Sequence, residues 1–129
     1  MSTEEISLDE AVIRFLDNDL CEFHFTETKH PIGLDTVKEM HDLLTERLGG
    51  SKIYMLVSTE PGAQMTQEAR DYASSDAFNT LSKADAIIRA DYSHEMAANF
   101  FIRFNRPGRP VKLFPSREKA LDWIESLRS

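Results

Sequence analysis

Residues 84–115 constrain the fold more than any other stretch, because they contain a complete strand–helix–strand unit. Residues 84–90 are mostly apolar, with the β-branched Ile87 and Ile88 at their centre, and a turn-prone Asp-Tyr-Ser follows. A helical stretch comes next, and it cannot continue through Pro107-Gly108. Residues 111–114 then resume as a strand. This unit predicts one turn of an α/β winding.

The helix within this unit carries five apolar residues that we predict to form one buried stripe: Met96, Ala97, Phe100, Phe101 and Phe104. We expect Phe101 in particular to be structural. Arg103 and Arg106 fall on the opposite, exposed side near the carboxyl end of the helix. They could offset the negative end of the helix dipole or bind an anion, and both interpretations stay open.

The rest of the chain alternates in the same way. Residues 10–16 and 20–26 predict an antiparallel hairpin, and residues 34–48 an amphipathic helix that ends at Gly49-Gly50. A strand at 52–58, a helix at 67–74 capped by Thr66 and a last helix at 117–128 capped by Ser116 complete the pattern. The predicted fold is α/β, in the order β-β-α-β-α-β-α-β-α. Its mixed five-stranded sheet has an N-terminal antiparallel hairpin and otherwise parallel strands.

Strand alternation divides this sheet into two faces of different character. One face is apolar throughout and consists of Cys21, Phe23, Phe25, Ile53, Met55, Val57, Ala84, Ala86 and Ile88. The other face is only half apolar and includes Glu22, His24, Tyr54 and Arg89. Because right-handed crossovers would place every helix on one side, we expect the second face to be solvated or to contact a partner. A symmetric homodimer is one such arrangement.

Length and composition indicate one globular domain, at residues 10–129, after a flexible segment at 1–9. The apolar runs are far shorter than the roughly 20 residues that a membrane helix needs, so we expect no membrane insertion. The acidic N-terminus argues against a signal peptide. The single cysteine, Cys21, excludes an intramolecular disulfide. Together these features predict a cytoplasmic protein.

Charge is distributed unevenly along the chain. The formal net charge is −7, yet residues 101–129 contain seven of the 15 Lys and Arg residues and only three of the 22 Asp and Glu residues. The acidic remainder argues against nucleic-acid binding. It permits a local basic contact for an anion or an acidic protein surface, with four candidate residues: Arg103, Arg106, Arg109 and Lys112.

No catalytic signature is present in the sequence. The four histidines lack paired metal spacing, Cys21 falls on the apolar face of its strand, and no glycine-rich phosphate loop follows a strand. His24 beside Glu22 could form a weak metal or acid–base site, although a solvent-facing strand residue is the simpler interpretation. We therefore expect no enzymatic activity, no cofactor and no metal.

The last third of the chain resembles a known family. It contains Asn99-Phe100-Phe101, Phe104-Asn105, Pro107, the strand Lys112-Leu113-Phe114 and the run Glu118-Lys119-Ala120-Leu121-Asp122-Trp123-Ile124. These motifs resemble small, uncharacterised bacterial proteins of SpoIIAA-like (STAS) fold. The resemblance implies a mixed sheet with a strand–helix winding. Better-known members bind a partner kinase and are phosphorylated on a serine after a central strand. Ser58 and Thr59 occupy the corresponding segment, which lacks the family's aspartate.

These observations predict a non-enzymatic regulatory or protein-interaction module, whose partner is another cytoplasmic protein or a second copy of the chain. The alternative is a binder of a small molecule or lipid-like ligand, with an apolar pocket near the phenylalanine-rich helix. A closed apolar cavity beside Phe100 or Phe104 would favour the ligand binder. A filled core with a flat, half-apolar face would favour protein contact.

Overall fold

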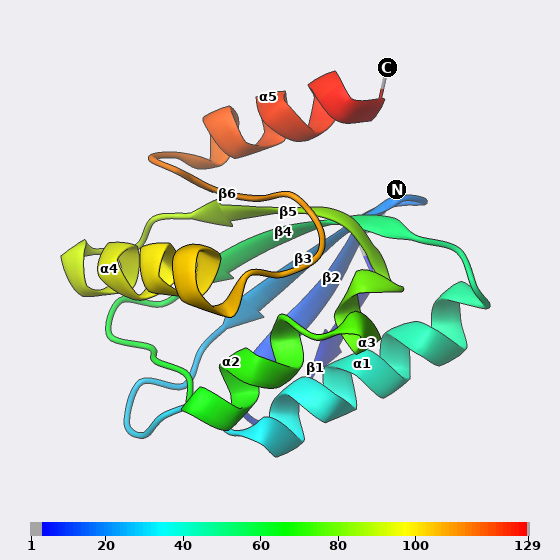
Figure 1. The fold of residues 1–129 in the computed structure, drawn as a ribbon. Helices are drawn as coiled ribbons and strands as arrows, with labels where there is room; N and C mark the ends of the chain where they lie inside the picture. The colour runs from blue at the N-terminus through cyan, green and yellow to red at the C-terminus, as the bar shows by residue number, and fades with distance from the viewer. Residues whose placement is uncertain (1–3, 129) are drawn as a thin grey trace.

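The structure, a computed structural model, describes residues 4–128 and contains one six-stranded sheet in the order β1-β2-β3-β4-β5-β6 (Figure 1). Its strands are β1 (Glu4–Ser7), β2 (Ala11–Asp17), β3 (Leu20–Phe25), β4 (Ile53–Thr59), β5 (Ser82–Ile88) and β6 (Val111–Phe114). Strands β1 to β3 pair antiparallel, and β3 to β6 pair parallel. The predicted mixed α/β fold is confirmed, but the sheet has six strands and not five.

The additional strand is β1, which lies within the segment expected to be flexible. It pairs antiparallel with β2, so that Ile6 is opposite Ile13 and joins the edge of the core. A four-residue strand with one inward apolar side chain is too short to show an alternating pattern in the sequence. The expectation of flexibility for residues 1–3 lies outside the described residues.

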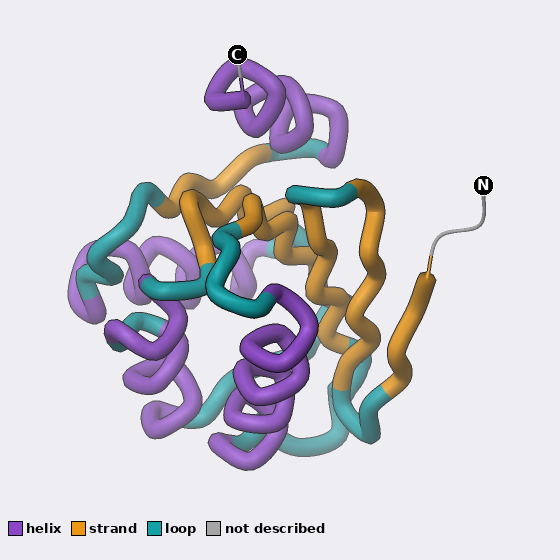
Figure 2. Tube along the Cα trace, turned by 90° about the vertical axis from the view of Figure 1, so that its right-hand side faces the viewer, coloured by secondary structure: helices purple, strands orange, loops and turns teal. Residues whose placement is uncertain are grey.

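The helices lie on both faces of the sheet (Figures 1 and 2). They are α1 (Leu34–Leu48), α2 (Gln67–Ala73), α3 (Asp76–Asn79), α4 (Tyr92–Phe100), the π-helical turn η1 (Phe101–Asn105) and α5 (Arg117–Arg128). Helices α1 to α4 cover one face, and α5 lies on the other. Since α5 follows the last strand, no crossover rule fixes its side. Among residues 4–128, no helix has the length and apolarity that crossing a membrane requires.

The main core lies between the sheet and α1 to α3. It contains the apolar faces of the predicted hairpin strands β2 and β3, including Ile13, Cys21 and Phe23, and the apolar side of the amphipathic helix α1, with Val37, Met40 and Leu44. Gly49 ends α1 in the left-handed conformation, with φ of 57°. These local predictions are confirmed because each follows from a regular apolar period within one element.

Helix α5 covers the sheet face that was expected to be open. Ala120 and Ile124 of α5 pack on Tyr54 and Leu56 of β4 and on neighbouring β5 alanines. The Tyr54 hydroxyl donates a hydrogen bond to the Leu127 carbonyl at 3.1 Å. The prediction of a solvated or partner-binding face is therefore wrong over β4 and β5, where the partner is the chain's own last helix.

The side chains of β5 point to the opposite sides of the sheet from those predicted. The β4–β5 register shifts between Ile53 and Tyr54, so that Asp85 aligns with Met55 and Ile87 with Val57. Ala84 and Ala86 consequently lie on the α5 side, although we assigned them to the face that bears Met55. An irregularity in register is invisible in the alternation of a single strand. It directs the carboxylate of Asp85 toward α1 to α4.

Helix α4 is rotated relative to its predicted orientation. Its buried residue is Ala98, and Phe101 and Ile102 of η1 are half-buried beside it. Four large side chains instead form an exposed row, here named the apolar ridge: Tyr92 (74% exposed), Met96 (57%), Phe100 (44%) and Phe104 (64%). The predicted burial of Met96, Ala97, Phe100 and Phe104 is wrong, because the inward side of α4 is set by packing on Ile87 and Val111 and not by maximal hydrophobicity.

The packing of α5 predicts that Ile124→Ala lowers the free energy of unfolding by about 2–4 kcal/mol, because the substitution empties a fully buried aliphatic site on β4 and β5. Leu127→Ala, at a position 40% exposed on the same helix, should change it by less than about 1 kcal/mol. Urea denaturation of both variants measures the difference. Equal losses would show that α5 is not anchored through Ile124.

Candidate functional site

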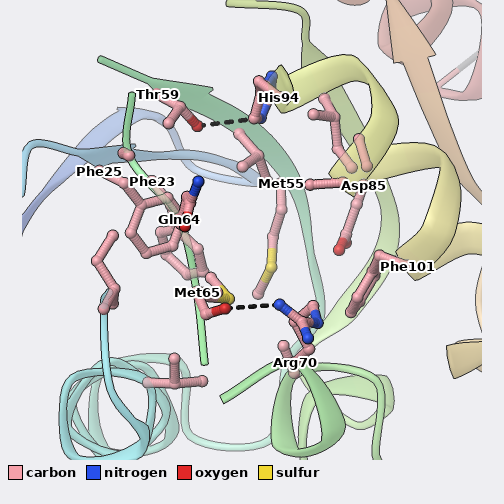
Figure 3. A pocket seen from close by; sticks show the side chains of 18 of the residues that line it. Phe23, Phe25, Met55, Thr59, Gln64, Met65, Arg70, Asp85, His94 and Phe101 are labelled. Atoms are coloured by element: carbon pink, nitrogen blue, oxygen red, sulfur yellow. Dashed lines mark hydrogen bonds between the residues drawn. The ribbon is translucent and has the colours of Figure 1, made fainter. Parts of the chain in front are cut away.

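A cavity of about 140 Å³ lies between the sheet and α1, α2 and α4 (Figure 3). Its wall is mostly apolar, with Phe23 and Phe25 of β3, Met55 of β4 and Phe101 of η1 among the residues that form it. Gln64, an exposed residue of the segment before α2, also lines the cavity. An engineered cavity of similar size in another protein binds benzene, so this volume suffices for one aromatic ring.

Arg70 of α2 contributes a positive charge to the cavity wall. Its guanidinium donates to the Met65 carbonyl at 2.6 Å and to Gln67 Oε1 at 2.9 Å. Its Nε is buried and has no hydrogen-bond partner in the described part of the chain. The guanidinium also lies 6.0 Å from the ring centre of Phe100. A buried, unpaired donor on a cation is costly unless an acceptor reaches it.

His94, at the start of α4, borders the same cavity in a defined tautomer. Its Nδ1 accepts the backbone N–H of Ala90 at 3.1 Å, so the ring proton resides on Nε2, which donates to Thr59 Oγ1 at 3.3 Å. Burial lowers the pKa of His94, and the nearby Asp91 carboxylate opposes this only in part. His94 therefore borders the cavity as a neutral imidazole, with its N–H already donated to Thr59.

Asp85 and Arg109 form a buried ion pair at the base of the cavity. Arg109 Nη2 lies 2.7 Å from Asp85 Oδ2, and Arg109 Nε lies 3.0 Å from Asp85 Oδ1. The same guanidinium donates to Asn79 Oδ1 and to the Ala73 carbonyl, while Ser82 donates to Asp85. The Arg109 side chain is only 4% exposed. Its predicted role in an exposed basic patch is therefore wrong.

Gly108, next to this arginine, is closely packed against Asn79. A Cβ at this position would lie 2.7 Å from the side-chain nitrogen of Asn79. Because Asn79 also holds Arg109, a larger residue at position 108 would disturb the ion pair.

The other predicted basic residues remain on the surface. Arg103 and Arg106 are exposed at the carboxyl end of η1, and Arg106 Nε donates to the Arg103 carbonyl. Lys112 is exposed on β6, with its amine 5.5 Å from the ring centre of Trp123. The four candidates thus do not form one patch: Arg109 is internal, and Lys112 lies against α5.

The four residues predicted on the open sheet face are also separated by the structure. Glu22 is 1% exposed, and Tyr54 is buried under α5, so neither belongs to an open surface. His24 is half-buried. Arg89 is exposed and lies 3.8 Å from Glu95 of α4.

Glu22 is the centre of a polar network at the edge of α5. Its carboxylate accepts two hydrogen bonds from Arg117, at 2.8 and 2.9 Å, and one from the Ser58 hydroxyl at 2.6 Å. Burial raises the pKa of Glu22, but the hydrogen bonds from Arg117 and Ser58 and the charges of Arg117 and Arg14 outweigh it, so the pKa is lowered overall. Glu22 is therefore ionised.

Ser58, His24 and Glu60 are arranged like a hydrolytic triad, but their protons are placed differently. Ser58 Oγ lies 2.8 Å from His24 Nδ1, and His24 Nε2 lies 3.0 Å from Glu60 Oε1. Because the Ser58 hydroxyl donates to Glu22, His24 must donate to Ser58 through Nδ1. A histidine that donates to the serine cannot remove its proton, so this arrangement lacks the base of a triad.

Two further side-chain groups are explained by local structure. Glu10, Glu27 and His30 could together hold a metal ion. However, the pKa of His30 is raised, first by its hydrogen bond to the Pro31 carbonyl and then by the Glu27 and Glu10 carboxylates, which favours an imidazolium between two acids. Cys21 is buried in the core, as predicted, and burial raises the pKa of its thiol to about 12, which disfavours the nucleophilic thiolate.

Sequence reasoning missed the cavity residues Gln64, Arg70 and Asp85. For Asp85 a signal was present, since a lone carboxylate in an otherwise apolar strand requires a buried partner. Arg70 gave no such signal, because an arginine on a short helix is ordinary. Its place in the wall depends on how α2 packs against the sheet.

The buried pair predicts that Arg109→Ala lowers the free energy of unfolding by about 3–5 kcal/mol, because Asp85 would keep a buried charge without its partner. The double variant Arg109→Met, Asp85→Leu should recover most of that loss. Arg103→Ala, at an exposed arginine, is the control and should change stability by less than about 1 kcal/mol. Chemical denaturation tests all three, and similar losses for Arg109→Ala and Arg103→Ala would contradict the buried pair.

The lowered pKa of Glu22 predicts that the free energy of unfolding depends on pH in the acidic range. Its pKa in the folded state lies below the ordinary value of 4.5, so its contribution is fully present above that value and is lost as pH falls through the folded pKa. The stability advantage of the native protein over Glu22→Gln should therefore shrink between about pH 6 and pH 3. Arg117→Met should weaken the same dependence. Thermal denaturation across this range measures it, and parallel curves for the native protein and Glu22→Gln would refute the assignment.

Comparisons with known proteins agree with this architecture. The fold is similar to that of an uncharacterised DUF3478-family protein with a SpoIIAA-like fold from Shewanella loihica PV-4. The two chains are 18% identical, with a TM-score of 0.56, and the match covers 95% of this chain and 91% of the other. This likeness confirms the predicted SpoIIAA-like fold. No curated protein matches the chain.

A family model described as a domain of unknown function, DUF7793, matches residues 15–128. The matched segment runs from the end of β2 to the last turn of α5, and so includes every cavity residue named above. The chain is therefore a member of the DUF7793 family, with a SpoIIAA-like fold.

Proposed function

We propose that the chain is a binding domain for a small anionic molecule with an apolar body about the size of an aromatic ring or a short acyl chain. The observation that carries this proposal is the apolar cavity with the buried, unpartnered Nε of Arg70 in its wall. This corresponds to the ligand-binding alternative from the sequence, with the cavity beside Phe101 and not beside Phe100 or Phe104.

Charge around the cavity supports an anionic ligand. The charge of Arg109 is balanced by Asp85, while Arg70 has no carboxylate within ion-pair distance among residues 4–128. His94 is neutral, so it adds no charge of its own to the cavity wall. A carboxylate placed beside Arg70 would satisfy its free donor and its charge together, and charge-assisted hydrogen bonds are the stronger kind.

Size limits the apolar part of the ligand. Drug-sized ligands occupy pockets of about 300–1,000 Å³, well above the 140 Å³ available here. A long fatty acid would therefore require α4 to move, whereas a benzoate-sized or six-carbon acid would fit the apolar walls. The proposed ligand is therefore smaller than the lipid-like ligand that the sequence suggested.

We propose binding without catalysis. Both ring nitrogens of His94 are already hydrogen-bonded, because Nδ1 accepts from the Ala90 N–H and Nε2 donates to Thr59. The cavity thus offers the unpartnered Arg70 donor to an anion but no free histidine base for proton abstraction. We also propose that the protein is cytoplasmic, as its single cysteine led us to expect.

A regulatory or protein-interaction role is a second proposed function, and the apolar ridge on α4 and η1 favours it. The ridge contains four of the five exposed large hydrophobic side chains among the described residues. Exposed apolar groups concentrated on one surface commonly mark a contact with another molecule.

The ligand proposal predicts that benzoate or hexanoate shifts the amide resonances of cavity residues in ¹H–¹⁵N NMR spectra, while benzamide and hexanamide bind more weakly. Arg70→Met keeps an apolar stem but removes the charge, and it should weaken binding of the acids about 10- to 100-fold. Arg103→Met, an exposed arginine outside the cavity, is the control and should bind as the native protein does. Absence of shifts at about 10 mM acid, or equal binding by Arg70→Met, would overturn the proposal.

A further inference from the structure

The apolar ridge is bordered by a polar row with a defined order of charge. Glu95, Asn99 and Arg103 follow one another at intervals of four residues, so they lie along one flank of the same helix. The row begins with an acid, has an amide at its centre and ends with a base. Asn99 and the Arg103 guanidinium make no side-chain interaction with any other described residue.

When two such rows run in opposite directions, the acid of each row lies opposite the base of the other. If two copies of α4 pack antiparallel about a two-fold axis, each ridge covers the other, with Tyr92 opposite Phe104 and Met96 opposite Phe100. The same operation places Glu95 of each copy beside Arg103 of the other and brings the two Asn99 amides together. A two-fold interface requires this kind of self-complementary surface.

The local geometry is suited to a close helix pair. Phe100 and Phe104 already pack together, with ring centres 4.6 Å apart, so part of the ridge is ordered before any contact. The other flank carries Ser93 and Ala97, whose small side chains allow a neighbouring helix to approach. The loose Arg89–Glu95 pair, at 3.8 Å, joins an exposed arginine to a half-buried glutamate and would compete only weakly for Glu95.

We propose that the ridge is a homotypic interface, at which two copies of the chain associate through antiparallel α4 helices. This inference rests on the proposed interaction role and is independent of ligand binding. An anionic membrane fits less well, because Glu95 borders the ridge and the chain carries a net charge of −7. The interface also differs from the sheet-face dimer expected from the sequence, since α5 covers that face.

Sedimentation velocity over a range of concentrations tests the association. The native protein should form dimers at micromolar concentration, and Met96→Asp and Phe104→Asp should raise the dissociation constant at least 10-fold while the circular dichroism spectrum stays native. Leu127→Asp, at an exposed apolar residue of α5, is the matched control and should dimerise normally. A native protein that is monomeric at 100 μM would overturn the inference.

Charge exchange tests the antiparallel arrangement itself. Glu95→Arg alone and Arg103→Glu alone each place like charges together across the proposed axis, and each should weaken dimerisation about 10-fold or more. The double variant Glu95→Arg, Arg103→Glu restores opposite charges and should recover dimerisation to within about threefold of the native protein. Additive weakening in the double variant would overturn the antiparallel pairing.

Photocrosslinking separates this inference from the broader interaction role. When p-benzoylphenylalanine replaces Met96 in cells that express the protein, the homotypic interface predicts crosslinks between two copies of the chain. A crosslink only to a different protein would overturn the homotypic interface and leave the interaction role standing. No protein crosslink, combined with binding of the monomer to vesicles of anionic phospholipid, would overturn both.

Discussion

The ion pair between Asp85 and Arg109 joins the parts of the fold that enclose the cavity. Through one guanidinium, Arg109 contacts β5, the carbonyl of Ala73 at the end of α2 and the side chain of Asn79 in α3. Two opposite charges this deeply buried are tolerated only because each is also hydrogen-bonded, with Ser82 completing the set around the carboxylate. The pair thereby fixes how α2 and α3 sit against the sheet, and it defines the base of the cavity.

The two faces of the sheet have different consequences for function. On one face, α5 packs on small β5 residues, while Glu22 and Arg117 join its edge to the sheet with charge-assisted hydrogen bonds. On the other face, α4 makes fewer buried contacts, and the cavity lies under it. The face that the sequence predicted to be open is thus covered by α5 over β4 and β5. The face that the sequence predicted to be core lies next to the cavity, and the apolar ridge lies on the outer side of α4, which covers this face.

The phenylalanines of α4 and η1 illustrate why hydrophobic spacing alone did not locate the core. Two rows on this helix are apolar, and the sequence favours the row with the larger side chains. The structure buries the other row, with Ala98 innermost, because β5 and β6 approach the helix closely and a small residue is needed there. Phe101 faces the cavity, whereas Phe100 and Phe104 remain in solvent and give the ridge its character.

The sequence by itself determined the elements whose signals are local: the β2–β3 hairpin, the α1 stripe with its glycine end, the Thr66 and Ser116 caps, and the winding between β5 and β6. Each depends on residues within a few positions of one another. Only the tertiary structure decided the face of β5, the side on which α5 packs, the burial of Arg109 and the free donor of Arg70 in a cavity wall. These depend on strand register and on packing between distant segments, and no local period in the chain encodes them.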